Sequence, residues 1–258
     1  MRTLRPMLIL LLAAVGCGSS KPNPDGAGGT SGGSQSFMPL AIGNHWTYQI
    51  KDPDGTISSK VRTVVAEEPV GGVGPHAAAM AFRLVSGNKI ADPEGDRSWQ
   101  AWVDADGGKR LVRYREQSVD NKDGFVKNET YWDPPRLYLD DTTTRVAAGG
   151  NWREPEYTEY KIDIDRVDPD GGVGLDGGDS VIPDGGMKMT TAIQDVWMVI
   201  SAKQSITVPA GTFDALALRR VGNQGSSIKN FWYARGIGKL RETEEGQPTE
   251  ELSSYLVQ

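Results

Sequence analysis

Residues 46–51 read Trp46-Thr47-Tyr48-Gln49-Ile50-Lys51, and their pattern indicates the fold class. Its large apolar side chains alternate with polar ones at a period of two, which is typical of a strand with one buried face. The next four residues, Asp52-Pro53-Asp54-Gly55, have the composition of a tight turn. A strand that runs directly into a turn predicts an antiparallel sheet.

The same unit of a short strand and a turn recurs along the chain. Residues 157–166 have the clearest alternation, with Tyr160, Ile162 and Ile164 on one side. Residues 105–108 (Ala-Asp-Gly-Gly) are typical of a hairpin turn, whereas the pair Pro134-Pro135 interrupts the pattern, so we expect a strand to end there. The other predicted strands cover residues 58–67, 80–85, 97–103, 110–119, 125–132, 195–203, 205–208, 213–220, 229–234, 239–244 and 252–257.

Roughly a dozen strands at short spacing, without an amphipathic helix, predict an all-β fold. We expect one antiparallel domain over residues 37–258, either a strongly curved sheet resembling a half-barrel or a β-sandwich. That length is acceptable for a single all-β domain. The similar stretches at residues 43–46 and 149–152 are too short to divide it into two halves.

The first 16 residues are typical of a secretory signal peptide. Arg2 and Arg5 provide the charged start, and residues 7–15 form a short apolar run. A transmembrane helix needs roughly 20 apolar residues, about twice the length of this run. We therefore expect export rather than a membrane-spanning helix.

The sequence is compatible with two ways of cleaving the signal peptide. Ala14 and Gly16 flank Val15 in a pattern that suits ordinary signal peptidase. Alternatively, Ala14-Val15-Gly16-Cys17 resembles the signal of bacterial lipoproteins, which implies that Cys17 carries a diacylglyceryl thioether and an N-acyl chain such as palmitate. Because Cys17 is the only cysteine and lies at the cleavage point, lipidation is favoured. Two or more acyl chains give stable membrane attachment.

Residues 17–36 would then be a lipidated cysteine followed by a flexible linker. Residues 18–36 are rich in Gly, Ser and Pro and predict an r.m.s. reach of roughly 25 Å. Gly18 and Ser19 follow the cysteine, without the aspartate associated with retention at an inner membrane. We therefore expect an exported protein anchored at the cell envelope, at the outer membrane and facing the periplasm or the cell surface.

The charge of the chain excludes several partners. Without Arg2 and Arg5, the mature chain has 26 basic and 34 acidic residues and a formal charge of −8. Such a chain repels nucleic-acid phosphates and has no basic patch for anionic lipids. With Cys17 lipidated, no thiol remains for a disulfide, a metal site or a nucleophile.

Three segments together resemble a widespread group of uncharacterised bacterial lipoproteins. They are residues 39–48, 208–215 and 232–240, which follow the patterns PL-x-x-G-N-x-W-x-Y, VPAGTF and W-Y-A-x-G-x-G. The resemblance implies a curved antiparallel sheet similar to the half-barrel of periplasmic lipoprotein carriers, and it implies no catalytic residue. We interpret the segments as fold determinants, with Gly211 in a hairpin turn and Gly236 and Gly238 at a bulge or bend.

The strongest metal candidate is an Asp/Gly-rich loop over residues 168–186. Calcium takes six to eight oxygen ligands, and Asp168, Asp170, Asp176 and Asp179 distantly resemble calcium-binding loops, with Asp163 and Asp165 just before them. The spacing departs from the EF-hand, so a solvated insertion is the alternative. We expect no other cofactor, since His45 and His76 do not have the spacing of metal ligands.

Catalytic motifs are absent from the sequence: it contains no serine-hydrolase elbow, phosphate loop or dinucleotide fingerprint. Glu129 with Asp163 would serve as a glycosidase-like pair, although solvated strand faces account for both. The seven tryptophans could line an apolar or sugar-binding hollow. Trp99 and Trp102 are expected on opposite strand faces, with one of them exposed.

These observations predict a membrane-anchored cell-envelope lipoprotein with a non-enzymatic binding or structural domain. Its ligand would be a lipid, a glycan or an envelope protein. The alternative is an envelope hydrolase, glycosidase-like, that uses carboxylates.

Overall fold

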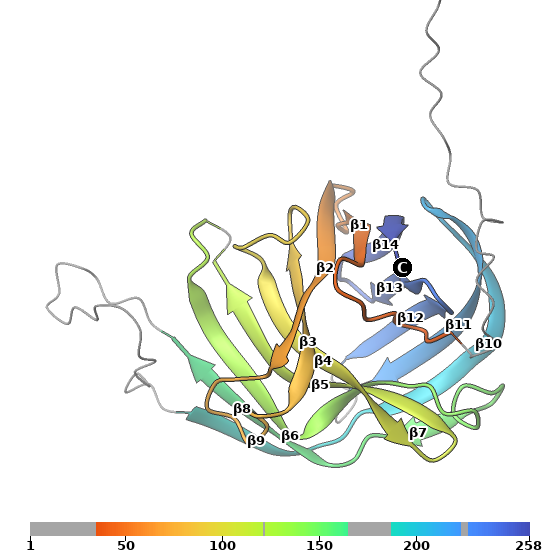
Figure 1. Ribbon diagram of the computed structural model, residues 1–258. Helices are drawn as coiled ribbons and strands as arrows, with labels where there is room; N and C mark the ends of the chain where they lie inside the picture. The colour runs from red at the N-terminus through yellow and green to blue at the C-terminus, as the bar shows by residue number, and fades with distance from the viewer. Residues whose placement is uncertain (1–34, 121, 165–186, 223–226) are drawn as a thin grey trace, which may run out of the picture. The chain divides into compact units, whose positions relative to one another are not determined.

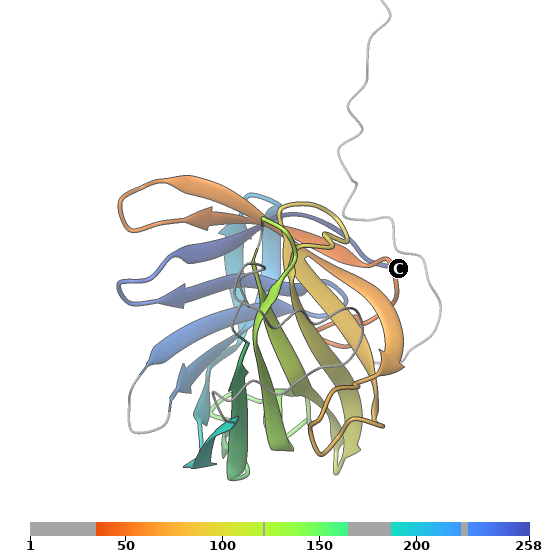
Figure 2. The same ribbon diagram turned by 90° about the vertical axis from the view of Figure 1, so that its left-hand side faces the viewer.

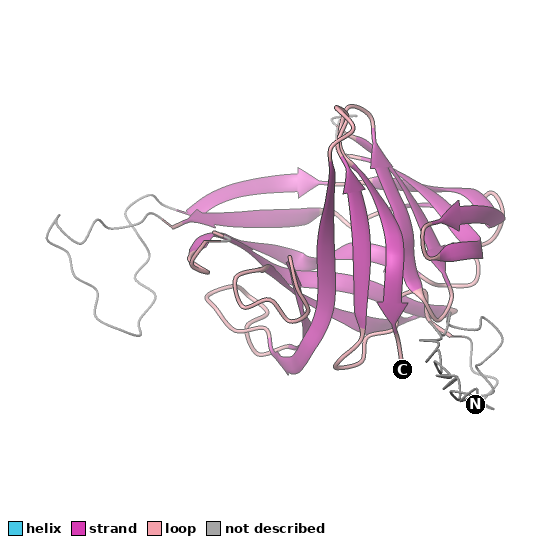
Figure 3. Cartoon of the chain, turned by 90° about the horizontal axis from the view of Figure 1, so that it is seen from above, coloured by secondary structure: helices cyan, strands magenta, loops and turns pink. Residues whose placement is uncertain are grey.

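A computed structural model of the chain describes residues 35–120, 122–164, 187–222 and 227–258. The described residues form fourteen β-strands and no helix, which confirms the all-β prediction (Figure 3). Within them, no helix is long and apolar enough to cross a membrane.

All fourteen strands belong to one antiparallel sheet. Their order across the sheet is β7-β10-β11-β12-β13-β14-β1-β2-β3-β4-β5-β6-β8-β9. The strands are β1 His45–Lys51, β2 Ile57–Pro69, β3 Met80–Gly87, β4 Asp96–Ala105, β5 Gly108–Val119, β6 Val126–Asp140, β7 Asn151–Arg153, β8 Tyr157–Asp163, β9 Met187–Ile193, β10 Val196–Val208, β11 Gly211–Val221, β12 Ile228–Ala234, β13 Gly238–Glu244 and β14 Thr249–Leu256.

The sheet is open and strongly curved, so that its two flanks face each other across a concave interior (Figures 1 and 2). Strand β1 joins the flanks by pairing with β14 on one side and β2 on the other. Several strands contain β-bulges, for example at Thr47/Tyr48 and Trp99/Gln100, and bulges increase local twist and bending. The curved-sheet prediction is therefore confirmed, and the β-sandwich alternative is wrong.

Three details differ from the predicted strands. Pro134-Pro135 does not end a strand, because β6 continues through it, with a cis Asp133-Pro134 peptide bond and a shift in its register against β5. The predicted strands 195–203 and 205–208 are one bulged strand, β10. The short strand β7 and the strand β9 were not predicted. β7 has only three residues, and its pairing with β10 comes from the tertiary fold.

One end of the concave interior is an apolar core. Trp46, Leu216 and Leu240 are among its fully buried side chains. The segment that precedes β1 covers this end: the indole nitrogen of Trp102 donates to the carbonyl oxygen of Met38 at 2.9 Å, and the amide of Gly236 donates to the carbonyl oxygen of Ser36 at 2.9 Å. The N-terminal side of the domain is thus tied to the apolar end.

The other end of the interior is charged, because side chains that face inward change character along each strand. On β2, the inward positions run from Val64 through Arg62 to Lys60, and each points to the same face because residues alternate at a period of two. On β12, they run from Tyr233 to Lys229. The sheet therefore encloses an apolar half and a polar half.

Candidate functional site

The polar half of the interior contains a cavity of about 330 Å³. This volume lies at the lower end of the range for small-molecule sites, roughly 300–1,000 Å³. A neighbouring hollow of similar size shares part of its wall and reaches the exposed β13–β14 turn at Gln247 and Pro248, so the cavity opens at the end of the sheet opposite the apolar core. The cavity is lined by Lys60, Arg62, Ser86, Asp96, Arg97, Ser98, Arg113, Glu116, Arg136, Tyr138, Arg220, Lys229, Phe231, Lys239, Glu242 and Glu250.

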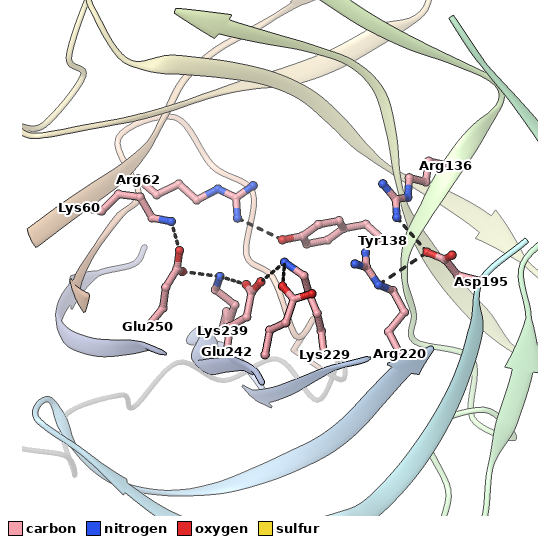
Figure 4. Close-up of polar contacts among 11 residues, drawn as sticks. Lys60, Arg62, Arg136, Tyr138, Asp195, Arg220, Lys229, Lys239, Glu242 and Glu250 are labelled. Atoms are coloured by element: carbon pink, nitrogen blue, oxygen red, sulfur yellow. Dashed lines mark hydrogen bonds and ion pairs between the residues drawn. The ribbon is translucent and has the colours of Figure 1, made fainter. Parts of the chain in front are cut away.

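These side chains come from both flanks of the sheet and converge on the space between them (Figure 4). Eight lining residues are cationic and four are acidic. Two further carboxylates, Asp195 and Glu244, form ion pairs with lining cations, and this still leaves two positive charges in excess. A net positive interior is notable because the whole chain has a formal charge of −6.

Around β2, β12, β13 and β14, lysines and glutamates neutralise each other. The ammonium of Lys239 lies 2.5 Å from Glu242 and 2.6 Å from Glu250, which are cross-strand partners on β13 and β14. Lys229 lies 3.3 Å from Glu242, and Lys60 forms an ion pair with Glu250. Burial opposes ionisation of Glu242, but these lysines outweigh it and hold the pKa of its carboxyl well below the usual range.

Toward β5, β6 and β11, arginines outnumber carboxylates. Arg136 and Arg220 share Asp195, at 2.8 and 3.6 Å, and Arg113 lies 2.6 Å from Glu116. The Nε atom of Arg113 is buried without a hydrogen-bond acceptor among the described residues, and that of Arg220 has only its 3.6 Å ion pair with Asp195. The hydrogen-bonding capacity of these two guanidinium groups is therefore not fully used by the described residues.

Arg62 is the buried arginine among the described residues that line the cavity. Its side chain lies between the two flanks, and the residue is only 7% exposed. Within the described part of the chain it forms no ion pair; its one hydrogen bond is a 3.5 Å contact to the hydroxyl of Tyr138, and its Nε has no acceptor. Burying an unpaired charge is unfavourable, so this arrangement needs an explanation beyond stability.

The electric potential at this point is positive, because the charges of Arg62, Lys239 and Arg113 converge on it. Burial opposes ionisation of Tyr138, but the charges of Arg62, Lys239 and Arg113 outweigh it and lower the pKa of its phenol. Burial, together with Lys239 and Arg62, lowers the pKa of the Lys60 ammonium to about 8. An environment that stabilises a phenolate and destabilises an ammonium favours an added anion.

The predicted glycosidase-like pair is not assembled. Glu129 is the cross-strand partner of Ile162, so the adjacent Asp163 projects from the opposite face. Glu129 accepts a hydrogen bond from Arg115 at 2.6 Å, and Asp163 lies 2.7 Å from Lys188. The two carboxylates therefore cannot act on one substrate bond.

The tryptophans do not line the cavity, so the predicted tryptophan-lined hollow is wrong. Trp99 and Trp102 lie on opposite faces, as predicted, but neither is exposed. Trp99 packs with Val70 and Ala81 on the outer face, and Trp102 packs against the main core. The chain uses its indoles for packing and leaves the hollow to charged side chains.

The predicted metal and lipid sites lie mostly outside the described residues: Cys17, Asp165, Asp168, Asp170, Asp176 and Asp179. Among the residues that are described, no group of three or more His, Cys, Asp or Glu side chains is arranged to hold a metal ion. His45 Nδ1 lies 3.1 Å from the carbonyl oxygen of Gly43, and His76 Nε2 lies 3.1 Å from Asp133. The calcium prediction for the Asp/Gly-rich loop therefore stays a prediction.

One buried carboxyl has a raised pKa. Glu154 is 1% exposed; its Oε1 accepts a hydrogen bond from the indole nitrogen of Trp197 at 2.7 Å, and its Oε2 is buried without a partner. Burial raises the pKa of Glu154 to about 7. Glu154 does not line the cavity. We interpret it as a buried group whose ionisation weakens the fold.

Replacing Glu154 with glutamine is therefore expected to stabilise the protein at pH 8. Because the pKa of Glu154 is higher in the folded than in the unfolded state, the protonated carboxyl favours folding. This contribution to the free energy of unfolding is complete below the carboxyl pKa of the unfolded chain and is lost as the pH rises through about 7. At about 1.4 kcal/mol per pKa unit, the gain at pH 8 should be about 2–3 kcal/mol, and it should vanish near pH 4. Urea denaturation at both pH values measures it, with the exposed Glu156→Gln as control. An equal effect of Glu154→Gln at both pH values would refute the assignment.

Comparisons with known proteins give a distant structural likeness. The sequence matches no protein-family model and no curated protein. Among solved structures, the chain is similar to a provisionally identified exported protein with a YmcC-like fold from Bacteroides fragilis NCTC 9343, at 13% identity and a TM-score of 0.43, over 86% of this chain and 99% of that one. It is also similar to a provisionally identified lipoprotein from Parabacteroides distasonis ATCC 8503, at 12% identity and a TM-score of 0.39, over 87% of this chain and 100% of that one.

Proposed function

We propose that this chain is a lipid-anchored cell-envelope lipoprotein whose domain is a non-enzymatic binding module. The ligand site is the charged cavity between the two flanks of the curved sheet. The observation that supports this most directly is Arg62, a buried guanidinium at the centre of the cavity without a carboxylate partner among the described residues. A domain that only fills a structural role would gain nothing from such a group.

The geometry of the domain supports uptake of the ligand from solution. The chain enters β1 at His45, beside the apolar end, whereas Ile50 near the other end of β1 borders the hollow at the cavity opening. The proposed tether therefore joins the domain at the end opposite its opening. The apolar end is filled by core side chains such as Trp46 and Leu216, which leaves the charged cavity as the binding site.

The carboxylates of the cavity support binding rather than hydrolysis. A glycosidase needs one carboxyl that holds a proton near neutral pH beside one that is ionised. In this cavity, Glu242 is kept ionised by its lysines, and Glu250 shares Lys239 with it. This arrangement provides counter-charges for lysines, and we therefore place the carboxylate-dependent hydrolase second.

Native mass spectrometry of the protein purified from its own host tests the binding role. We expect a bound small molecule on the wild-type chain and its loss in Ser86→Phe, which puts a bulky side chain into the cavity wall. The matched control is Ser205→Phe on β10, which is exposed and does not line the cavity. A bare mass for the wild-type chain, or a bound molecule that survives Ser86→Phe, would contradict the proposal.

The anchor has a separate test. Replacing Cys17 with serine removes the thiol that lipidation requires, so the variant should move from the membrane pellet to the soluble fraction. Wild-type protein should label with a palmitate analogue, and Cys17→Ser should not. Membrane attachment that is unchanged in Cys17→Ser would show that Cys17 is not the anchor.

A further inference from the structure

We infer that the ligand of this cavity carries an oxyanion group, a carboxylate, phosphate or sulfate, which binds at Arg62 between the two flanks of the sheet. This inference rests on the proposed binding function and specifies the chemistry of its ligand.

The charge balance places the missing anion at Arg62. Arg62 and Lys239 are the two buried cations among the described residues. Lys239 bridges Glu242 and Glu250, whereas the described residues give Arg62 no carboxylate and only the hydroxyl of Tyr138 at 3.5 Å. Because a buried charge is stabilised by a close counter-charge, an anion that enters the cavity would pair Arg62 more fully than this single long contact.

The unused donors have the geometry that an oxyanion needs. The Nε atoms of Arg62 and Arg113 are buried and lack an acceptor among the described residues, and both residues line the same cavity as Arg220 and Arg136. A guanidinium presents its donors in a planar fork that matches two oxygens of a carboxylate or a phosphate. Several such forks around one hollow favour a ligand with more than one anionic oxygen.

Tyr138 marks where the oxyanion would bind. Its ring lies 4.7 Å from the guanidinium carbon of Arg113, and its hydroxyl lies 3.5 Å from Arg62. Its lowered phenol pKa shows that this position already favours negative charge. We expect the oxyanion to take over the contact that Arg62 now makes with Tyr138.

The shape of the cavity indicates a hydrophilic carrier for the oxyanion. Of its sixteen lining residues, only Phe231 is a fully apolar side chain. The apolar half of the interior is occupied by buried core residues, which leaves no channel for an acyl chain. A small acidic molecule such as a sugar acid or a sugar phosphate fits these conditions, and a phospholipid does not.

Isothermal titration of the mature chain with four soluble probes tests the inference: inorganic phosphate, glucuronate, glucose 6-phosphate and neutral glucose. We expect saturable binding of at least one anionic probe that weakens with salt, and no binding of glucose. Arg62→Met should weaken the bound probe about 10–100-fold, the range for loss of a charge-assisted hydrogen bond. Arg62→Lys should retain part of the affinity, because it keeps the charge and loses the fork.

The control is Arg219→Met, which removes an exposed arginine outside the cavity and should leave binding unchanged. Glucose binding as tightly as the anions, or Arg62→Met binding like the wild type, would overturn the inference. Binding of the Cys17→Ser variant, which has no anchor, to phosphatidylglycerol vesicles but to none of the soluble probes would overturn the hydrophilic carrier. If native mass spectrometry finds a neutral molecule bound, the oxyanion inference is refuted while the binding function stands. If it finds no bound molecule and none of the probes binds, the binding function itself is refuted.

Discussion

Replacing Lys239 with methionine is expected to destabilise the domain by about 3–5 kcal/mol at pH 7. Lys239 is 4% exposed and bridges Glu242 and Glu250, which lie opposite each other on neighbouring strands. Without the ammonium, the two carboxylates repel each other in a poorly hydrated space. Each keeps one remaining lysine, Lys229 or Lys60, and so the loss should stay below that of two isolated buried charges.

The pH dependence of this effect follows from the pKa of Glu242. The lowered pKa of Glu242 stabilises the folded state at pH values above the usual carboxyl pKa, and this stabilisation is lost as the pH falls. In Lys239→Met the carboxyls become protonated more readily, so the difference between variant and wild type should shrink toward pH 4. Urea denaturation at pH 7 and pH 4 measures both values. A variant as stable as the wild type at pH 7 would refute the role of Lys239 as a structural counter-ion.

The matched variant Arg62→Met should have the opposite sign. It removes one buried positive charge from the same cavity, but no carboxylate of the described chain loses its partner. Replacing buried ionic groups by apolar ones often stabilises proteins by about 1–4 kcal/mol. For a domain of this size, each kcal/mol raises Tm by roughly 2–4 °C. A clear fall in Tm would mean that Arg62 holds the fold together. A rise, together with lost binding, would mean that its charge serves a ligand.

The contrast between Lys239 and Arg62 also shows why the site could not be predicted from the sequence. The alternation Lys60-x-Arg62-x-Val64 on β2 is visible in the sequence, and it places two cations on the same face as a core residue. That pattern could have identified inward-facing charge. What it could not supply is the partner of each cation, because Glu250 reaches Lys60 from a strand about 190 residues further along the chain.

More of the fold than of the site could be predicted from the sequence. Alternation on β1 and β8 and the turns between strands are local properties, and they sufficed for an all-β antiparallel sheet. The choice between a curved sheet and a sandwich depends on β1 pairing with β14, a contact between the two ends of the domain. Strand β7 is held by pairing with β10 and by the stacking of Trp152 on Trp197, which no local pattern encodes.

The three segments at residues 39–48, 208–215 and 232–240 lie at the apolar end of the sheet. The indole nitrogen of Trp46, from the first segment, donates to the carbonyl oxygen of Ile237, from the third, at 2.5 Å. The amide of Ala210, from the second, donates to the carbonyl oxygen of Leu252 on β14, the strand beside β1. Trp46 is fully buried. This meeting point supports the interpretation that the segments determine the fold.

Gly238→Ala should therefore be among the most damaging single-methyl changes in the domain, at about 3–5 kcal/mol. Gly238 has a φ of +121°, where an alanine is strained by about 1–3 kcal/mol. A Cβ at this position would also lie 2.8 Å from Nε1 of Trp46, and that indole is held by its hydrogen bond to Ile237. Because the core around Trp46 is close-packed, the ring has little room to move away.

The control is Gly55→Ala in the β1–β2 turn, where φ is +91° and nothing lies within 4 Å of the added methyl group. It should cost only the backbone strain, about 1–3 kcal/mol. The difference between the two variants in urea denaturation then isolates the close approach of Gly238 to Trp46. Equal losses would show that the glycine of the third segment is needed for its backbone conformation alone. A larger loss at Gly238 would show that the first and third segments stabilise the domain as one packing unit.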